Sequence, residues 1–334
     1  MKSPITGKEM KLVKENTTLP FRKEVFPLVY HSYVCVDSEE QFTDNELDHI
    51  NQIQIYNQYR EKYGIPFPEE IHAVRKKYKV SASKMSEILG LGIHTYRQYE
   101  SGEIPSVANG RLILAVKQPE EFVKQVKASF HILNEKESKK FIETAEGIER
   151  EESESIWEKI FERKIFQCEA PNEFSGYKTP DFDKISNVIS YLSDKTDLYK
   201  TKLNKLLFYS DFRLYQLTGS SMTGITYRAI EYGPVPKEYE KLYLKLCDDE
   251  KIKFEEVLFD NGNVGEMIRS RTPFNSDSLA EDERKILDNV LKAFKGMNTK
   301  QIVDVSHQER AWYENKDEKK IISYQKYAYD LKAF

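Results

Sequence analysis

The stretch 69–105 constrains the fold of this chain more than any other part of its sequence. Its letters are EEIHAVRKKYKVSASKMSEILGLGIHTYRQYESGEIP. Apolar residues recur in it at helical spacing, which predicts three short helices, over 69–78, 82–89 and 93–101. Ser81 can cap the second helix, because its hydroxyl can accept a backbone N–H that the first turn leaves free. Gly90 and Gly92 allow a tight turn, and Pro105 prevents the third helix from continuing.

Two helices joined by so short a turn form a helix-turn-helix, whose second helix enters the major groove of DNA. One face of each predicted helix gathers the residues expected to share an inner side: Ile71, Val74, Tyr78, Met85, Ile88, Leu89, Ile93, Tyr96 and Glu100. The alternative is that 69–131 is only a packing unit of five short helices, since glycine turns between helices are common.

The candidate DNA contacts lie on the second and third predicted helices. Gln98 can bond adenine in a bidentate way, and Arg97 can bond guanine or a phosphate. His94 and Thr95 occupy the leading turn of the third helix. Phosphate contacts that position the protein without specifying a base are expected from the second helix, at Ser83 and Lys84.

The charge distribution agrees with a DNA contact by one segment and argues against binding of nucleic acid over the whole surface of the chain. The whole chain has 51 basic and 55 acidic residues, a net charge of −4. Segment 69–134 has 10 basic and 7 acidic residues and is net positive. A DNA-binding surface needs such a local excess.

Outside this stretch the chain changes character several times. Residues 1–45 contain β-forming runs such as PLVYHSYVCV, and a helix is expected over 46–63. An acidic segment, 135–175, is expected to be a charged helix or linker. Residues 176–334 are expected to form a second globular unit, with helices over 181–194, 200–218, 236–247 (starting at Pro236) and 280–295, and β structure over 252–271 with a turn at Asn261-Gly262-Asn263.

Composition excludes several classes of protein. No run of about 18 apolar residues exists, so no membrane span is expected. The first residues lack the apolar core of a secretory signal. Cys35, Cys168 and Cys247 are odd in number and far apart, which argues against a disulfide framework and fits a reducing cytosol.

Residues 1–130 resemble the MqsA, or YgiT-type, antitoxins, which join a small zinc ribbon to an Xre-type helix-turn-helix. The resemblance lies in KKYKVSASKMSEILGLGIHTYRQYESGEIPS and in RLILAVKQPEEFVKQV. It implies operator binding as a homodimer. By position it implies base recognition at His94 and Gln98, where the family pattern has Asn and Arg.

The N-terminus departs from that family. The family's opening Met-Lys-Cys-Pro-x-Cys is replaced by Met1-Lys2-Ser3-Pro4-Ile5-Thr6, and its second Cys-x-x-Cys by Cys35-Val36-Asp37-Ser38. Neutral hydroxyls are poor zinc ligands beside thiolates. We therefore expect 1–68 to keep the shape of the ribbon without metal; binding by Cys35, His31 and His49 is a lesser alternative.

Residues 180–330 resemble the Panacea, or SocA-like, domain. The resemblance lies in the helix KLNKLLFY at 202–209, the turn YGPVP at 232–236, and the late His307 and Trp312. Proteins with this domain are mostly antitoxins of two-gene systems or adaptor-like binders of a toxin. The resemblance implies a largely helical domain that binds a toxin.

The YGPVP turn is expected to be rigid and exposed, because its prolines fix φ and its glycine supplies unusual φ. Aromatic residues and arginines are typical interface anchors, so the expected toxin contacts are Tyr227, Arg228, Tyr232, Pro234 and Tyr239. The alternative is that these residues pack locally. No nucleophile elbow, phosphate loop or HExxH motif accompanies His307, so an enzyme is not expected.

Together these inferences predict a mainly α protein with a small β-rich N-terminal unit. Its predicted domains are a degenerate zinc-ribbon-like unit (1–68), a helix-turn-helix domain (69–134), an acidic linker (135–175) and a Panacea domain (176–334). We expect a cytoplasmic antitoxin without cofactors, which binds a cognate toxin and operator DNA but no membrane. The alternatives are a transcription regulator with a C-terminal sensor, and an adaptor that delivers a toxin to a protease.

Overall fold

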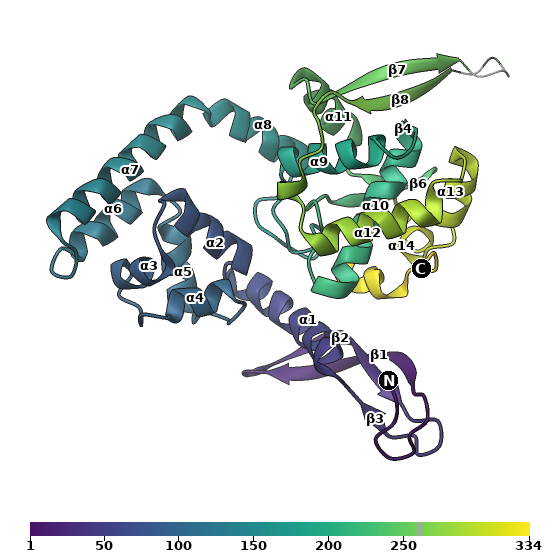
Figure 1. Cartoon of the computed structure of the whole chain (residues 1–334), viewed down its shortest axis with the longest axis horizontal. Coiled ribbons are helices and arrows are strands. Elements are labelled where there is room, and N and C mark those ends of the chain that lie inside the picture. Colours follow the sequence, from purple (N-terminus) through teal and green to yellow (C-terminus); the bar gives the residue numbers. More distant parts are fainter. Residues whose placement is uncertain (259–261, 263) are drawn as a thin grey trace. The chain divides into compact units, whose positions relative to one another are not determined.

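The computed structural model of the chain describes residues 1–258, 262 and 264–334. About 51% of the residues are helical, with a three-stranded sheet at the N-terminal end and a helical C-terminal region. The predicted fold class, mainly α with a small β-rich N-terminal unit, is confirmed. The chain divides into two compact units, residues 1–55 with 163–334, and residues 56–162. Figure 1 shows the elements in sequence colours.

The N-terminal sheet is built on one long hairpin. Strands β1 (Lys11–Phe21) and β2 (Glu24–Val34) pair antiparallel along their whole length, and β3 (Gln41–Phe42) adds to the end of β2. Helix α1 (Asn45–Tyr63) follows. Two of its amide side chains bond the backbone of β2: Asn51 to the N–H and C=O of His31 at 2.8 and 2.9 Å, and Gln54 to those of Val29, both at 2.9 Å. These amides satisfy backbone groups that no neighbouring strand pairs there.

The same hairpin touches the end of the chain within its unit. The Lys14 ammonium donates to the carbonyl oxygen of Tyr329 at 2.9 Å. The ring of Tyr329 meets that of His31 edge to face, with centroids 4.8 Å apart. Both rings are buried. The β hairpin is therefore fixed to the C-terminal segment by packing and by a hydrogen bond.

Residues 56–162 form a helical unit with one apolar core. Its helices after α1 are α2 (Pro68–Lys77), α3 (Ala82–Ile88), α4 (Thr95–Glu100), α5 (Val107–Ala115), α6 (Pro119–Ala128), α7 (Glu135–Glu154) and the start of α8 (Ile156–Phe166). The core contains Ile71, Val74, Tyr78, Met85, Ile88, Leu89 and Tyr96 among others, as the periodicity predicted. Ser81 caps α3 by accepting the N–H of Lys84 at 3.2 Å, as expected.

Three features of this unit differ from the prediction. Ile93 is 59% exposed rather than inward, because the chain at 93–94 is a turn and α4 begins at Thr95. Glu100 is held at the surface of the core by Arg75, with 2.6 Å between Nε and Oε1. Helix α7 adds Phe141 and Ala145 to the core, so this part of the acidic segment packs on the helical unit.

The C-terminal part is organised around α10 (Lys200–Thr218), most of whose residues are buried. Helices α12 (Glu281–Phe294) and α13 (Thr299–Ser306) pack against it (Figure 1). The other elements are α9 (Phe182–Ser193), β4 (Leu198–Tyr199), β5 (Tyr227–Ile230), β6 (Gly233–Pro236), α11 (Tyr239–Asp248), β7 (Ile252–Leu258), β8 (Val264–Ser270), η1 (Ser276–Ser278), α14 (Arg310–Tyr313), α15 (Tyr324–Tyr327) and η2 (Ala328–Asp330).

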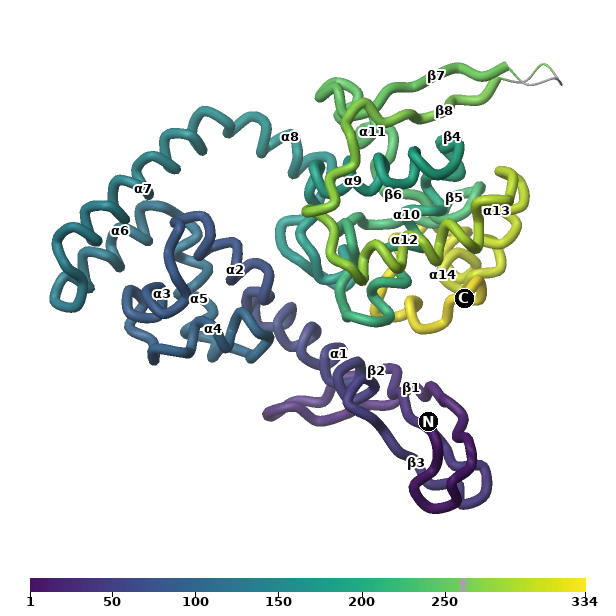
Figure 2. Tube along the Cα trace, in the orientation of Figure 1, coloured from purple at the N-terminus to yellow at the C-terminus, as the bar shows by residue number. Residues whose placement is uncertain are grey.

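One expected element of this part begins later than predicted, and another is found where it was predicted. A helix was predicted to start at Pro236, but Pro236 ends strand β6 and the helix starts at Tyr239. Strands β6 and β5 form a two-stranded sheet, which agrees with prolines lacking the N–H that a further neighbour of β6 would need. The predicted β region is the hairpin β7–β8, whose path can be followed in Figure 2. Of the turn predicted at 261–263, Asn261 and Asn263 lie outside the described residues.

Among the helices that the structure describes, none combines the length and apolar character needed to cross a bilayer.

Candidate functional site

The sequence motifs of the C-terminal part converge around the backbone of Gly233. Lys205, on α10, is fully buried, and its side-chain nitrogen donates to the carbonyl oxygen of Pro234 at 2.8 Å. Gly233 has φ +95°, and a Cβ at this position would lie 2.4 Å from Ser306 Oγ and 2.8 Å from Lys205 Cε. Only glycine fits here, because both the backbone conformation and the space exclude a side chain.

The acceptor of Lys205 is a neutral carbonyl rather than a carboxylate. Burial lowers the pKa of the Lys205 amine to about 7, because removal from water disfavours the charged form. The buried amine therefore positions the hairpin β5–β6 against α10 without a full counter-charge.

Trp312 and His307 also contribute to the position of the same hairpin. The indole N–H of Trp312 donates to the carbonyl oxygen of Ile230 at 2.6 Å. The His307 ring stacks on Trp312 with centroids 3.8 Å apart and planes at 9°. Burial lowers the pKa of His307, and its Nε2 has no hydrogen-bond partner among the described residues. The two late residues thus help to fix the turn of the hairpin.

A buried carboxylate anchors the chain that leads into this hairpin. Asp211 of α10 accepts the backbone N–H groups of Met222 and Thr223 at 2.8 and 2.7 Å. It also accepts the hydroxyls of Thr223 and Tyr227 at 2.6 and 2.7 Å. Burial raises the pKa of Asp211 to about 6, although four donors around one carboxyl group favour its charged form. The loop 219–226 is therefore tied to α10.

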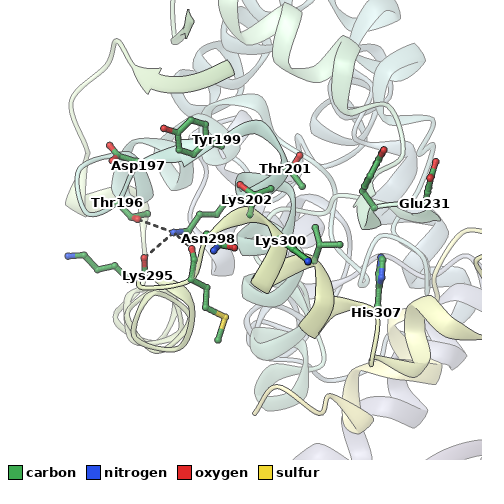
Figure 3. Close-up of a pocket in the computed structure, with 14 residues that line it drawn as sticks. Thr196, Asp197, Tyr199, Thr201, Lys202, Glu231, Lys295, Asn298, Lys300 and His307 are labelled. Atoms are coloured by element: carbon green, nitrogen blue, oxygen red, sulfur yellow. Dashed lines mark hydrogen bonds between the residues drawn. The ribbon is translucent and has the colours of Figure 1, made fainter. Parts of the chain in front are cut away.

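Beside the hairpin turn lies a pocket of about 1160 Å³. One wall comes from the junction of α9 and α10, another from α12, α13 and their connection, and the turn of the β5–β6 hairpin adds a third (Figure 3). The lining residues are Thr196, Asp197, Tyr199, Thr201, Lys202, Glu231, Tyr232, Lys295, Met297, Asn298, Thr299, Lys300, Val303 and His307.

The structure separates the five expected toxin contacts into two groups. Tyr227 and Pro234 are buried, so neither presents its side chain to a partner in this conformation. The exposed turn is shorter than expected, because the whole of β6 is buried. Tyr232 is 61% exposed at the tip and lines the pocket. Arg228 and Tyr239 are half-buried. Of the five, Tyr232 is therefore the best placed for a partner contact.

The expected DNA contacts lie on α3 and α4 and on the turn before α4. His94, Arg97 and Gln98 are exposed, and Ser83 and Thr95 are half-buried. Lys84 forms ion pairs with Glu87 at 2.8 Å and Glu137 at 3.5 Å, so it would have to leave them to reach a phosphate. Ile93, which sequence periodicity had assigned to the core, is exposed and adds an apolar group beside His94. The periodicity did not show that residues 93–94 form a turn and not the start of the helix.

The four positions at which the MqsA resemblance would place zinc ligands, Ser3, Thr6, Cys35 and Ser38, lie close together. Thr6 Oγ1 lies 3.5 Å from Cys35 Sγ. Hydrogen bonds from Ser3, Ser38 and Thr6 lower the pKa of the Cys35 thiol to about 6. Among the described residues, no three His, Cys, Asp or Glu side chains gather in a way that could hold a metal ion. One thiol with three hydroxyls is a poor zinc site.

With these features in place, the comparisons identify the class of the C-terminal part. Residues 203–313 match the family model described as Antitoxin SocA-like, Panacea domain. No curated protein matches the chain. The match confirms the predicted Panacea resemblance, and an antitoxin-like domain suggests a regulatory rather than an enzymatic role. It does not extend to residues 1–202, so the resemblance to the MqsA-type antitoxins stays a prediction.

Proposed function

We propose that this chain is the antitoxin of a two-gene toxin–antitoxin pair. It binds the cognate protein toxin through the Panacea domain and blocks it by occlusion. The observation that carries the proposal is the family match over 203–313, a span that contains the Tyr232 turn and much of the pocket beside it. An exposed aromatic side chain beside a hollow is the usual form of an interface anchor.

The second part of the proposal concerns DNA. The helix-turn-helix binds the operator of the gene pair, and the chain does so as a homodimer, because a two-fold operator presents two half-sites about one turn apart. The exposure of Arg97 and Gln98 on α4, and of His94 directly before it, supports this part. Substitution of Gln98 by Ala should relax base preference at one position of each half-site.

The test is co-expression of the full chain with the product of the adjacent gene. If the adjacent product alone stops growth, and the full chain restores it and co-purifies with it, the antitoxin proposal stands. A harmless adjacent product that does not bind would contradict it and favour the regulator. A chain that binds the toxin but restores growth only when a cellular protease is present would identify the adaptor.

Binding to the promoter of the gene pair is measured separately by gel shift. The variants Arg97→Ala and Gln98→Ala should bind more weakly than the natural chain, and Arg310→Ala, a surface arginine of the other unit, should bind as the natural chain does. Equal binding by all three variants would contradict operator binding through the helix-turn-helix. It would leave the proposed toxin binding unaffected.

A further inference from the structure

The pocket beside Tyr232 has more basic than acidic residues in its lining. Three lysines line it, Lys202, Lys295 and Lys300. The ammonium of Lys202 is nearly buried, and it bonds the carbonyl oxygens of Lys295 and Met297 at 3.0 and 3.1 Å and the Thr196 hydroxyl at 3.4 Å. None of these acceptors is a carboxylate. Burial lowers the pKa of Lys202, as expected for a cation without a full counter-charge.

The other two lysines are at the rim. Lys295 and Lys300 are exposed and form no ion pair among the described residues. Both flank the connection from α12 to α13, one on each side. Their ammonium groups can therefore turn to a ligand at little cost, since no ion pair with a described residue has to be broken first.

The acidic residues of the lining do not balance these cations. Asp197 is paired with Arg269, whose guanidinium lies 3.2 Å away. Glu231 lies in the hairpin turn next to Tyr232 and is the one lining carboxylate without an ion pair among the described residues. The pocket thus has an excess of positive charge in a part of the chain, 176–334, that has equal numbers of basic and acidic residues.

The lining also has apolar surface, which can contact the aliphatic part of a ligand's side chain or a neighbouring residue of the ligand. Tyr199, Met297, Val303 and the exposed ring of Tyr232 provide it. A small inorganic anion would leave this surface wet, whereas a peptide segment would cover it and release its water. The volume of about 1160 Å³ is enough for several residues of a chain.

We propose that this pocket receives an acidic segment of the partner protein, with side-chain carboxylates bound by Lys295 and Lys300 above the fixed charge of Lys202. The inference rests on the proposed function, since the partner is the toxin, and it adds where and by what chemistry the toxin is bound. Positive charge in a recessed site also speeds encounter with an acidic surface and rejects basic ones.

The test is the affinity of the full chain for the purified product of the adjacent gene, measured by calorimetry at two salt concentrations. The variant is Lys300→Glu, and the matched control is Lys292→Glu, another exposed lysine without an ion pair, which does not line the pocket. Lys300 lies in the first turn of α13, where a negative charge favours the helix. Loss of affinity in this variant therefore cannot be ascribed to a weaker fold.

We expect Lys300→Glu to raise Kd by about tenfold or more and to flatten its salt dependence, with Lys292→Glu within about twofold of the natural chain. Equal affinity of the two variants would overturn the inference while leaving the toxin-binding proposal intact. No binding by the natural chain would overturn the proposed function itself.

A charge exchange identifies the ligand group. Acidic surface residues of the partner are replaced one at a time by Lys. The variant that binds Lys300→Glu better than it binds the natural chain marks the segment in the pocket. Rescue by none of the acidic positions would overturn the assignment of side-chain carboxylates.

Discussion

Lys205 reaches the carbonyl oxygen of Pro234 through space that the missing side chain of Gly233 leaves free. Lys205 and Gly233 belong to separate motifs of the sequence: Lys205 lies in helix α10, and Gly233 lies in the hairpin β5–β6. Their contact, at the edge of the pocket, fixes the turn that carries Tyr232. A substitution at either position should therefore affect the stability of the whole hairpin.

Substitution of Gly233 by Ala should lower the free energy of unfolding by about 2–5 kcal/mol, from the cost of a positive φ and of the clash with Ser306 and Lys205. Urea unfolding measures it. Gly7→Ala is the control, since Gly7 also has positive φ but open space around it, and should cost only about 1–2 kcal/mol. Equal losses in both variants would contradict the close approach of Lys205.

Replacement of Lys205 by Met should change how stability depends on pH. The pKa of Lys205 is about 7 in the folded chain and 10.5 in the unfolded one. The unfolded state therefore binds more protons between these values, so this lysine makes the fold more stable as the pH rises from about 7 to about 10. The slope is at most about 1.4 kcal/mol per pH unit.

The Lys205→Met variant should lack this rise of stability with pH. In thermal unfolding at several pH values, the stability of the natural chain relative to the variant should therefore increase steadily across this range. Lys292→Met, at an exposed position, should leave the slope unchanged. Parallel curves for the natural chain and Lys205→Met would show that the amine is not held neutral.

Asp211→Asn should lower stability by about 2–4 kcal/mol, because the hydroxyls of Thr223 and Tyr227 lose a buried charged acceptor. Tyr227→Phe removes one donor and should cost about 1–2 kcal/mol. If the two positions interact only through this bond, the double variant should lose less than the sum of the two singles. Additive losses in chemical denaturation would separate Tyr227 from Asp211.

Local features of the sequence predicted much of this fold. The Ser81 cap and the apolar spacing of α2 and α3 depend on residues within one or two turns, so the sequence shows them directly. The buried stripe of α10 follows in the same way. These signals need no knowledge of distant parts of the chain.

Other features depend on contacts that sequence spacing does not show. A proline is typical of the first turn of a helix, but Pro236 lies in a strand, because β5 pairs with this segment. The amides of Asn51 and Gln54 look like ordinary polar residues of a helix until β2 lies beside them. The pocket was missed for the same reason: its lysines come from separate segments that only tertiary packing brings together.

Under the proposed function, Tyr232→Ala should weaken toxin binding and leave the fold intact. The side chain is exposed, so stability should change by less than about 0.5 kcal/mol. As an interface anchor it should contribute about 2 kcal/mol or more to binding. Leu244→Ala removes an exposed apolar group elsewhere on this unit and should leave binding unchanged. Calorimetry with the toxin distinguishes them, and equal affinities would remove Tyr232 from the interface.

The last prediction concerns Ile93, which the turn before α4 leaves exposed beside His94. An apolar side chain at the start of a recognition helix can contact the methyl group of thymine. Replacement of one thymine by uracil in each half-site removes that methyl and should weaken binding by about 0.8 kcal/mol, roughly fourfold. The Ile93→Ala variant should bind both DNAs equally, whereas Gln98→Ala should keep the preference for thymine. Footprinting on the promoter of the gene pair locates the half-sites, and titration of each uracil-substituted duplex gives the affinities. A preference for thymine that survives in Ile93→Ala at every position would show that Ile93 faces solvent in the complex as well.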